Sequence, residues 1–219
     1  LTAALGDPAR RAAMRQRMET GTDFENISLL VGFDNILATG LHLPEDLPLE
    51  GKSIAEIAAR AGKDPFDALF DLLEREACGP AMIDFITHEE DIADILRAPF
   101  SSVISDATYP AQGLPHPRVY GTFPRLLETY VCRRHVLTLP QAVRKITRLP
   151  ADRLGLSKKG RIEPGADADL NLFSPENIRE VGTFQDPKQL SSGMDYVFVG
   201  GVPAIAEGKF TGARNGTIL

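Results

Sequence analysis

The 219-residue chain contains 43% hydrophobic and 25% charged residues, a usage typical of folded globular proteins that excludes disorder as its main description. Its net charge of −6 argues against nucleic-acid and anionic-membrane binding, because both require a basic face that displaces counterions. No apolar run approaches the roughly 20 residues that cross a bilayer, and the amino-terminal residues lack the apolar centre of a signal peptide. We therefore expect a cytoplasmic protein with neither a nucleic-acid nor a membrane partner.

The amino-terminal part of the sequence predicts helices and one buried strand. Asp7, followed by a proline, is typical of a helix cap. Residues 27–31, ISLLV, are β-branched and leucine side chains that predict a buried strand. Two more helices are expected, one between the capping-box residue Ser53 and Gly62, and one that starts at Asp64.

The middle of the chain repeats a strand-and-helix pattern. Residues 81–86 and 101–105 predict short strands, and Thr87 with Glu90 predicts a capping box at the start of the helix between them. Strands that alternate with helices predict a parallel sheet, either open and doubly wound or closed into an eight-stranded barrel. Because ligands bind beyond the carboxyl ends of the strands in both architectures, the segment after residue 105 is the expected place for a site.

That segment, residues 106–121, is too rich in proline and glycine for a regular element and predicts a long loop. Helices are expected again at residues 123–135 and 140–148. After residue 158, short apolar runs around glycine-containing turns predict an antiparallel β tail. Asp167 and Asp169 in this tail lack the other oxygen ligands of a calcium loop, so we interpret them as turn residues.

Asp106, His116 and Arg118 are the reactive residues of the long loop. An aspartate at a strand end can ligate a metal or move a proton, an arginine offers a planar fork to a carboxylate, and a histidine can do either or neither. A long loop inside a compact domain is uncommon unless it is functional. The residue types alone leave a structural interpretation open, in which Asp106 caps the loop, His116 stacks on prolines and Arg118 is solvated.

Several motifs, in this order, resemble the carboxyl-terminal half of the N-acyl-D-amino-acid deacylases, the D-aminoacylases of the metal-dependent amidohydrolase superfamily. The most specific are Ser105-Asp106, HPRVYGTFP at residues 116–124, TRLPADRLGL at 147–156, GADADL at 165–170 and TGAR at 211–214. Residues 51–77 and 82–96 also resemble the family. The resemblance therefore covers nearly the whole chain and is weakest over residues 23–48.

The resemblance implies an α/β fold in which residues 1–157 are the carboxyl-terminal portion of a (β/α)8 TIM-type barrel and residues 158–219 are part of a small antiparallel β domain. Residues 81–86 and 101–105 would be the seventh and eighth barrel strands. A complete barrel takes about 250 residues, so we expect this chain to be a piece of a longer enzyme. Its uncovered strand edges predict association with a missing amino-terminal half or as a homo-oligomer.

The activity implied by the resemblance is hydrolysis of an N-acyl-D-amino acid to a carboxylate and a D-amino acid by a zinc-bound water. Asp106 matches the family's aspartate that carries the proton from water to the leaving amine, and it is also a possible metal ligand. Arg118 matches the arginine that holds the substrate's α-carboxylate, and His116 is carried over only as a residue that lines the substrate site. Ala107 stands where the family usually has glycine.

The resemblance also implies zinc ligands that this chain does not display: a His-x-His pair, a bridging cysteine or acidic residue, and two further histidines. The four histidines lie singly, and Cys132, three residues before His135 on a predicted helix, fits an apolar stripe. We therefore expect weak zinc binding and no activity from the chain by itself. Two hypotheses remain open: the carboxyl-terminal part of a zinc-dependent deacylase, and a truncated or split-gene fragment that acts as a dimerising or binding module.

Overall fold

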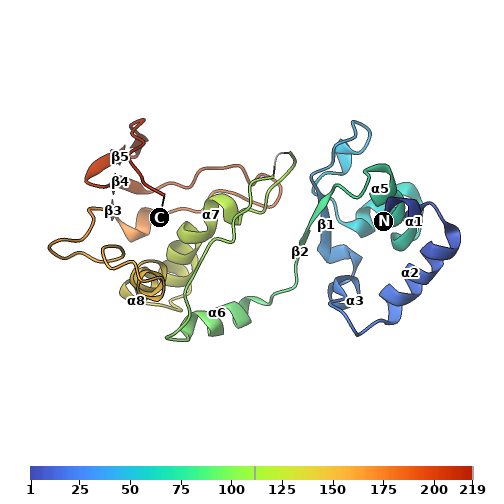
Figure 1. Cartoon of the computed structure of the whole chain (residues 1–219), viewed down its shortest axis with the longest axis horizontal. Helices are drawn as coiled ribbons and strands as arrows, with labels where there is room; N and C mark the ends of the chain where they lie inside the picture. The colour runs from blue at the N-terminus through green and yellow to red at the C-terminus, as the bar shows by residue number, and fades with distance from the viewer. Residues whose placement is uncertain (111, 219) are drawn as a thin grey trace. The chain divides into compact units, whose positions relative to one another are not determined.

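A computed structural model describes residues 1–110 and 112–218, which form two compact units (Figure 1). Unit 1 consists of Leu1–Thr87 and Thr108–His116, and unit 2 consists of His88–Ala107 and Pro117–Leu219. The chain therefore passes between the units on both sides of the segment 108–116. In the part of the chain that is described, no helix is long and apolar enough to cross a membrane.

Unit 1 is a mainly helical unit with one two-stranded sheet. Strand β1 (Ile36–Thr39) pairs antiparallel with β2 (Ala81–Asp84), in a register that sets Ile36 opposite Asp84 and Thr39 opposite Ala81. The helical elements are α1 (Thr2–Leu5), α2 (Pro8–Thr20), α3 (Ile27–Val31), η1 (Phe33–Asn35), η2 (Leu47–Leu49), α4 (Ile54–Ala61) and α5 (Pro65–Arg75).

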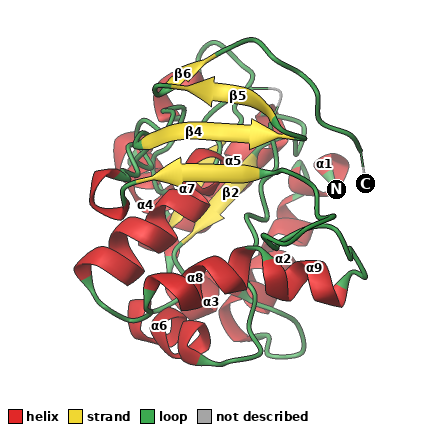
Figure 2. Cartoon of the chain, turned by 90° about the vertical axis from the view of Figure 1, so that its left-hand side faces the viewer, coloured by secondary structure: helices red, strands yellow, loops and turns green. Residues whose placement is uncertain are grey.

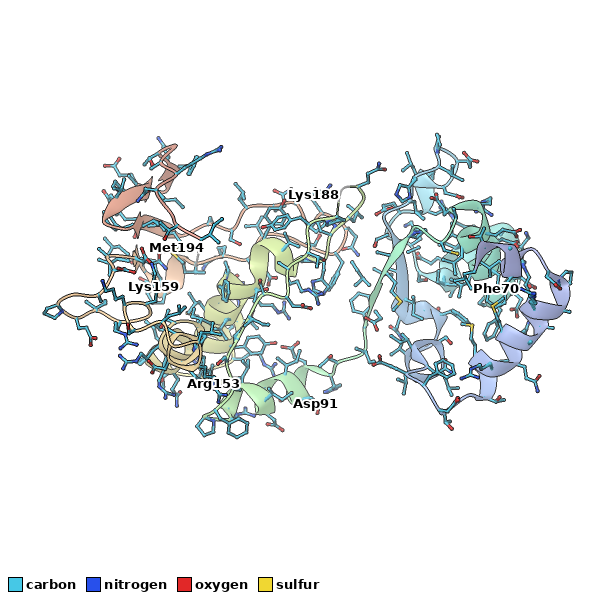
Figure 3. The ribbon with its side chains drawn as sticks, in the orientation of Figure 1. Phe70, Asp91, Arg153, Lys159, Lys188 and Met194 are labelled. Atoms are coloured by element: carbon cyan, nitrogen blue, oxygen red, sulfur yellow. The ribbon has the colours of Figure 1, made fainter. Side chains whose placement is uncertain are left out.

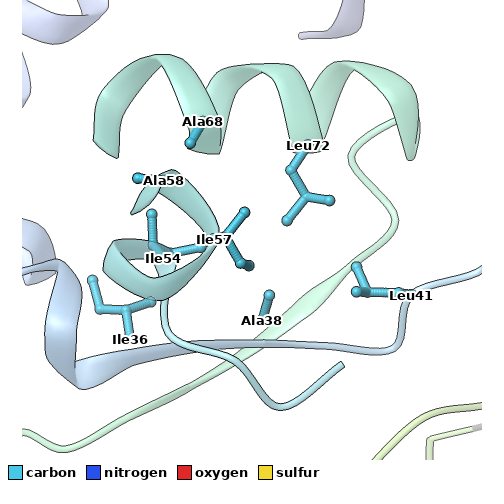
Figure 4. Packing of buried hydrophobic residues seen from close by; sticks show 8 residues of the cluster. All are labelled: Ile36, Ala38, Leu41, Ile54, Ile57, Ala58, Ala68 and Leu72. Atoms are coloured by element: carbon cyan, nitrogen blue, oxygen red, sulfur yellow. The ribbon is translucent and has the colours of Figure 1, made fainter. Parts of the chain in front are cut away.

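The core of unit 1 lies between helices α4 and α5 and strand β1 (Figure 4). Each helix contributes an apolar stripe, and Leu72 of α5 is 1% exposed. The buried members of this cluster are Ile36, Ala38, Leu41, Ile54, Ile57, Ala58, Ala68 and Leu72. Partly buried side chains such as Phe33 and Leu69 surround it.

The predicted helix starts of unit 1 are confirmed. Asp7 accepts hydrogen bonds from the backbone of the first turn of α2, and Asp64 does the same for α5. Ser53 and Glu56 form the reciprocal capping box of α4, and Gly62 ends that helix in the left-handed region with φ of 64°.

Two strand predictions for unit 1 need correction. Residues 27–31 form helix α3 rather than a buried strand, and Leu29 and Leu30 of this helix are exposed. An apolar run this short does not separate strand from helix by itself, and here no neighbouring strand pairs with it. Residues 81–86 do contain strand β2, but its antiparallel pairing with β1 is not the pairing of a parallel barrel strand.

Unit 2 combines a helical layer with a four-stranded antiparallel sheet of order β3-β4-β5-β6 (Figure 2). Gly200 and Gly201, both at positive φ, form the tight turn between β4 and β5, and a turn at Gly208 precedes β6. The predicted antiparallel tail is therefore confirmed. The elements are α6 (Glu89–Arg97), α7 (Arg118–Arg125), η3 (Leu126–Arg133), α8 (Leu139–Ile146), α9 (Arg148–Arg153), β3 (Leu170–Phe173), η4 (Pro175–Asn177), β4 (Met194–Val199), β5 (Val202–Ala206) and β6 (Lys209–Phe210).

The helix predicted at residues 123–135 starts earlier, at Arg118, and changes from α-helical to π-helical geometry at Leu126. Pro124 lies inside α7 and has no N–H to donate to the carbonyl of Tyr120. That carbonyl accepts a hydrogen bond from Ser191 Oγ at 3.0 Å instead. The hydrogen bond from Ser191 thus connects α7 to the segment before β4.

Two further predictions for unit 2 are wrong. Residues 101–105 form no strand, and Ile104 in this segment is 71% exposed. The cap of α6 is His88 rather than Thr87, because Nδ1 of His88 accepts from the backbone N–H of Glu90. The pattern of residues 87–90 is compatible with a cap at either position, and the ring nitrogen takes the place of the hydroxyl.

Candidate functional site

The structure brings two of the three predicted site residues together. Arg118 Nη2 lies 2.9 Å from Asp106 Oδ2, and both residues belong to unit 2. Asp106 lies in the segment without regular secondary structure that follows α6, and Arg118 is the first residue of α7. The Asp106 side chain is 73% exposed and that of Arg118 is 41% exposed. A carboxylate and a guanidinium therefore face solvent side by side, within reach of a small molecule.

The backbone of Asp106 has a φ of 45°, in the left-handed region that non-glycine residues seldom occupy. Asp tolerates this region better than most residues, and such strain often lies at functional sites. The Asp106 carboxylate contacts Arg118 at the amino-terminal end of α7, and Ala107 rather than glycine follows Asp106.

The segment that leads to Asp106 is fixed by Lys145 of α8, a residue that the sequence did not single out. The Lys145 ammonium donates to Ala98 O at 2.5 Å, to Ser101 O at 3.0 Å and to Ser101 Oγ at 2.9 Å. Lys145 is 4% exposed, and burial is the main cause that lowers its pKa. The available signal was a lysine flanked by the apolar residues Ala142, Val143 and Ile146 in the helix predicted at residues 140–148.

His116 lies in the loop 108–116, which groups with unit 1, and is half-buried. Glu50 holds this loop on the unit: its Oε1 accepts from the backbone N–H of Gly40 at 2.9 Å and of Leu114 at 2.7 Å. Gly113 leaves the room for this contact, because a Cβ there would lie 2.5 Å from Glu50 Oε1. The structure thus assigns His116 to a different unit from Asp106 and Arg118.

The residues present do not fit a zinc ion by themselves. A zinc site takes three or four nitrogen, sulfur or oxygen ligands, and no group of three His, Cys, Asp or Glu residues with metal-binding geometry exists among the residues described. Asp106 instead faces a guanidinium. Cys132 donates through its thiol to the carbonyl of Pro175, and His135 points into solvent as an exposed residue at φ of 52°.

Asp167 and Asp169, predicted as turn residues, lie between the turn at residues 163–166 and β3, and both form ion pairs. Lys159, which is labelled in Figure 3, has its Nζ 3.0 Å from Asp167 Oδ2 and 2.5 Å from Asp169 Oδ2 in the ion pairs of the structure. The hydrogen bond from Lys159, with a second from the backbone N–H of Gly200, lowers the pKa of Asp169. A lysine thus occupies the position at which a cation would bind.

Comparisons with known proteins agree with the motifs. The family model described as amidohydrolase family matches residues 37–205. D-aminoacylase of Alcaligenes xylosoxydans xylosoxydans is 36% identical over 171 residues, which are 78% of this chain and 34% of that protein. The chain thus spans about a third of the length of the curated relatives it matches.

Two solved structures share the mixed helix-and-strand fold. One is of D-aminoacylase, from work on its binuclear metal centre, with a TM-score of 0.73 and 32% identity, covering 85% of this chain and 37% of the other. The second is N-acyl-D-glutamate deacylase from Bordetella bronchiseptica, complexed with zinc and a phosphonate inhibitor, with a TM-score of 0.70 and 30% identity, covering 89% and 37%. With the match to more than half of its length, the chain belongs to the amidohydrolase family.

Proposed function

We propose that this chain is part of a zinc-dependent N-acyl-D-amino-acid deacylase, which hydrolyses the amide bond of an N-acyl-D-amino acid. The observation that carries the proposal is the exposed Asp106–Arg118 pair, with a separation of 2.9 Å, in a chain similar to D-aminoacylases. A carboxylate can move a proton, and a guanidinium beside it can bind the carboxylate of a substrate.

In this proposal Asp106 moves the proton. Its carboxylate accepts a proton from the water that attacks the acyl carbonyl, as the new C–O bond forms. It then gives the proton to the amide nitrogen as the C–N bond breaks, so that a carboxylate and a D-amino acid leave. Exposure of 73% of its side chain is consistent with this role, because the group must reach both water and substrate.

Arg118 orients the substrate by binding its α-carboxylate. A guanidinium carries five N–H donors in one plane, so a single side chain can contact Asp106 and a second carboxylate. The pair would therefore place the scissile amide next to the proton carrier. The role of His116, a residue of unit 1, in lining the substrate site stays a prediction from the family resemblance alone.

Zinc, when bound in the complete enzyme, supplies Lewis-acid activation of the reaction. The described residues hold no cluster of three ligands, so we propose that most ligands lie outside this chain, with Asp106 as the candidate ligand within it. A missing amino-terminal half, or a second copy of the chain, would then complete the site.

The proposal includes the finer architecture. Residues 1–157 would belong to the carboxyl-terminal portion of a (β/α)8 barrel, and residues 158–219 to a small β domain. Two features of the segment 101–105 support this: Ile104 is 71% exposed, and the buried hydroxyl of Ser102 has no hydrogen-bond partner among the described residues. A neighbouring strand in the complete protein would cover Ile104 and pair with the segment.

The experiment compares N-acetyl derivatives of a D-amino acid and its L-enantiomer as substrates. The complete protein, in which this chain is joined to the amino-terminal region, should release acetate from the D-compound in the presence of zinc, and much more slowly from the L-compound. The 219-residue chain alone should release none. No release by the zinc-loaded complete protein would contradict the proposal, and a stable dimer without activity would favour the binding-module alternative.

A further inference from the structure

Lys145 is a buried cation whose three hydrogen bonds all go to one segment of chain. Its acceptors are Ala98 O, Ser101 O and Ser101 Oγ, and an ammonium group has three hydrogens to donate. No ion pair between Lys145 and a carboxylate is found among the described residues, and after burial the like charge of Arg144 also lowers the pKa of Lys145. A buried charge without a counter-ion is costly unless its hydrogen bonds are complete.

The acceptors place Lys145 at the base of the segment that carries Asp106. The backbone adds a further link, because Val103 N–H donates to Lys145 O at 3.2 Å. The Val103 side chain packs against the hydrophobic core of unit 2. Only two residues then separate Val103 from Asp106.

The segment is therefore held from two sides. Lys145 fixes its beginning and Arg118 contacts its end at Asp106. Since residues 101–105 form no strand, no described ladder of backbone hydrogen bonds sets their position. A loss of the Lys145 contacts would let the segment shift, and the carboxylate at its end would shift with it.

We propose that Lys145 is a positioning residue for the proton transfer by Asp106, acting through the segment 98–106. The inference rests on the proposed deacylase function. Lys145 would contact neither the substrate nor the reacting atoms. Its loss would displace the Asp106 carboxylate, while the substrate's carboxylate would still bind Arg118.

The test has one arm that does not depend on activity. In the 219-residue chain, Lys145→Met keeps the length of the side chain and removes its three donors. Amide hydrogen exchange of Val103 should then accelerate about tenfold or more, relative to the amide of Val197 in β4. Arg144→Met, which removes an exposed cation one residue earlier on the same helix, should leave both rates unchanged.

The second arm measures the proton transfer in the complete protein. In an N-acetyl-D-amino acid, the leaving nitrogen must be protonated before the C–N bond can break. The comparison substrate is an acetyl aryl ester whose phenol carries a carboxylate. Its phenolate is weakly basic and leaves without being protonated. Lys145→Met should lower the ratio of amide to ester hydrolysis by roughly tenfold to a hundredfold. Lys145→Arg, which keeps charged donors, should recover part of this ratio, and Arg144→Met should not change it.

The two experiments distinguish a role of Lys145 in positioning Asp106 from a role in folding. They also distinguish failure of this inference from failure of the proposed deacylase function. A mere loss of folded protein would lower both hydrolysis rates equally, and an unchanged ratio would overturn the inference. Unchanged exchange at Val103 would overturn it as well. If the unsubstituted complete protein hydrolysed neither compound, the deacylase function would fail, and the exchange rates would still decide whether Lys145 anchors the segment.

Discussion

The two units place their notable carboxylates in opposite environments. In unit 1 the Glu76 side chain is 1% exposed and accepts hydrogen bonds from the backbone N–H groups of His42 and Leu43. In unit 2 the Asp106 side chain is 73% exposed and contacts the Arg118 guanidinium. The backbone of Asp106 has a positive φ.

The two environments suit different roles: the buried carboxylate suits a role in stability, and the exposed one a role in catalysis. A buried carboxylate with several donors holds the chain together and is not accessible to a substrate. An exposed ion pair contributes little to stability, with a typical value of 0–1 kcal/mol, and its groups are accessible. We therefore expect substitutions in unit 1 to affect unfolding, and substitutions at the pair in unit 2 to affect catalysis.

The largest expected effect is that of Asp106→Asn on catalysis. In the complete protein this change keeps the shape of the side chain and removes its ability to carry a proton, so kcat should fall roughly 10²- to 10⁴-fold. The free energy of unfolding of the 219-residue chain should stay within about 0.5 kcal/mol, because the side chain is exposed.

Asp94 provides the matched control for this substitution. It is also an exposed aspartate of unit 2, 76% exposed and 2.6 Å from Arg97. Asp94→Asn removes a similar ion pair and should leave kcat unchanged. Equal losses of activity from Asp94→Asn and Asp106→Asn would remove Asp106 from the proposed mechanism.

The next largest effect is expected in the core of unit 1. Leu72→Ala should lower the free energy of unfolding by about 2–5 kcal/mol, because the side chain is 1% exposed and its loss leaves a cavity. Leu30→Ala removes the same atoms from a side chain of a residue that is 64% exposed, and should cost under about 0.5 kcal/mol. Urea unfolding measures both. Similar costs would show that the core of Figure 4 does not stabilise unit 1.

A smaller effect is expected from Glu76. Burial by itself would raise its pKa, but hydrogen bonds from the Leu43 and His42 backbone and from the His42 ring outweigh burial and lower it. A carboxyl with a lowered folded pKa stabilises fully above its ordinary pKa of 4.5, and this stability is lost as pH falls through the lowered value. Unfolding of unit 1 should therefore become easier below about pH 4.5.

Glu76→Gln should lower the free energy of unfolding by about 1.5–3 kcal/mol at neutral pH. It should also make the free energy of unfolding depend less on pH in the acid range. Glu74→Gln, in the last turn of α5 just before Glu76, is the control, because the Glu74 side chain is 41% exposed in its ion pair with Arg11. It should cost less than Glu76→Gln. An identical pH dependence of unfolding in Glu76→Gln and in the original chain would contradict this assignment.

The sequence predicted best those features that a few neighbouring residues determine. The helix starts at Asp7, Ser53 and Asp64 follow from contacts two or three residues apart, and the turn at Gly200 follows from glycine's access to positive φ. The motifs at Asp106 and at residues 116–124 likewise singled out both residues of the ion pair, although not their contact.

Features that depend on distant residues were not predictable in this way. The apolar runs 27–31 and 101–105 resemble strands, but a strand needs a neighbour, and neither run has one in the described structure. Lys145 finds its acceptors more than forty residues away, at Ala98 and Ser101. No local pattern contains such a contact.

The most direct test of the central claim, that the exposed pair performs deacylation, is Arg118→Lys in the complete protein. If Arg118 clamps the α-carboxylate, a lysine loses the paired hydrogen bonds, and kcat/KM should fall roughly tenfold to a hundredfold. A substrate whose α-carboxylate is replaced by a neutral amide cannot use the clamp, so the loss should largely vanish with it. Equal losses on the two substrates would contradict the account and leave Arg118 as a brace of the Pro-rich loop.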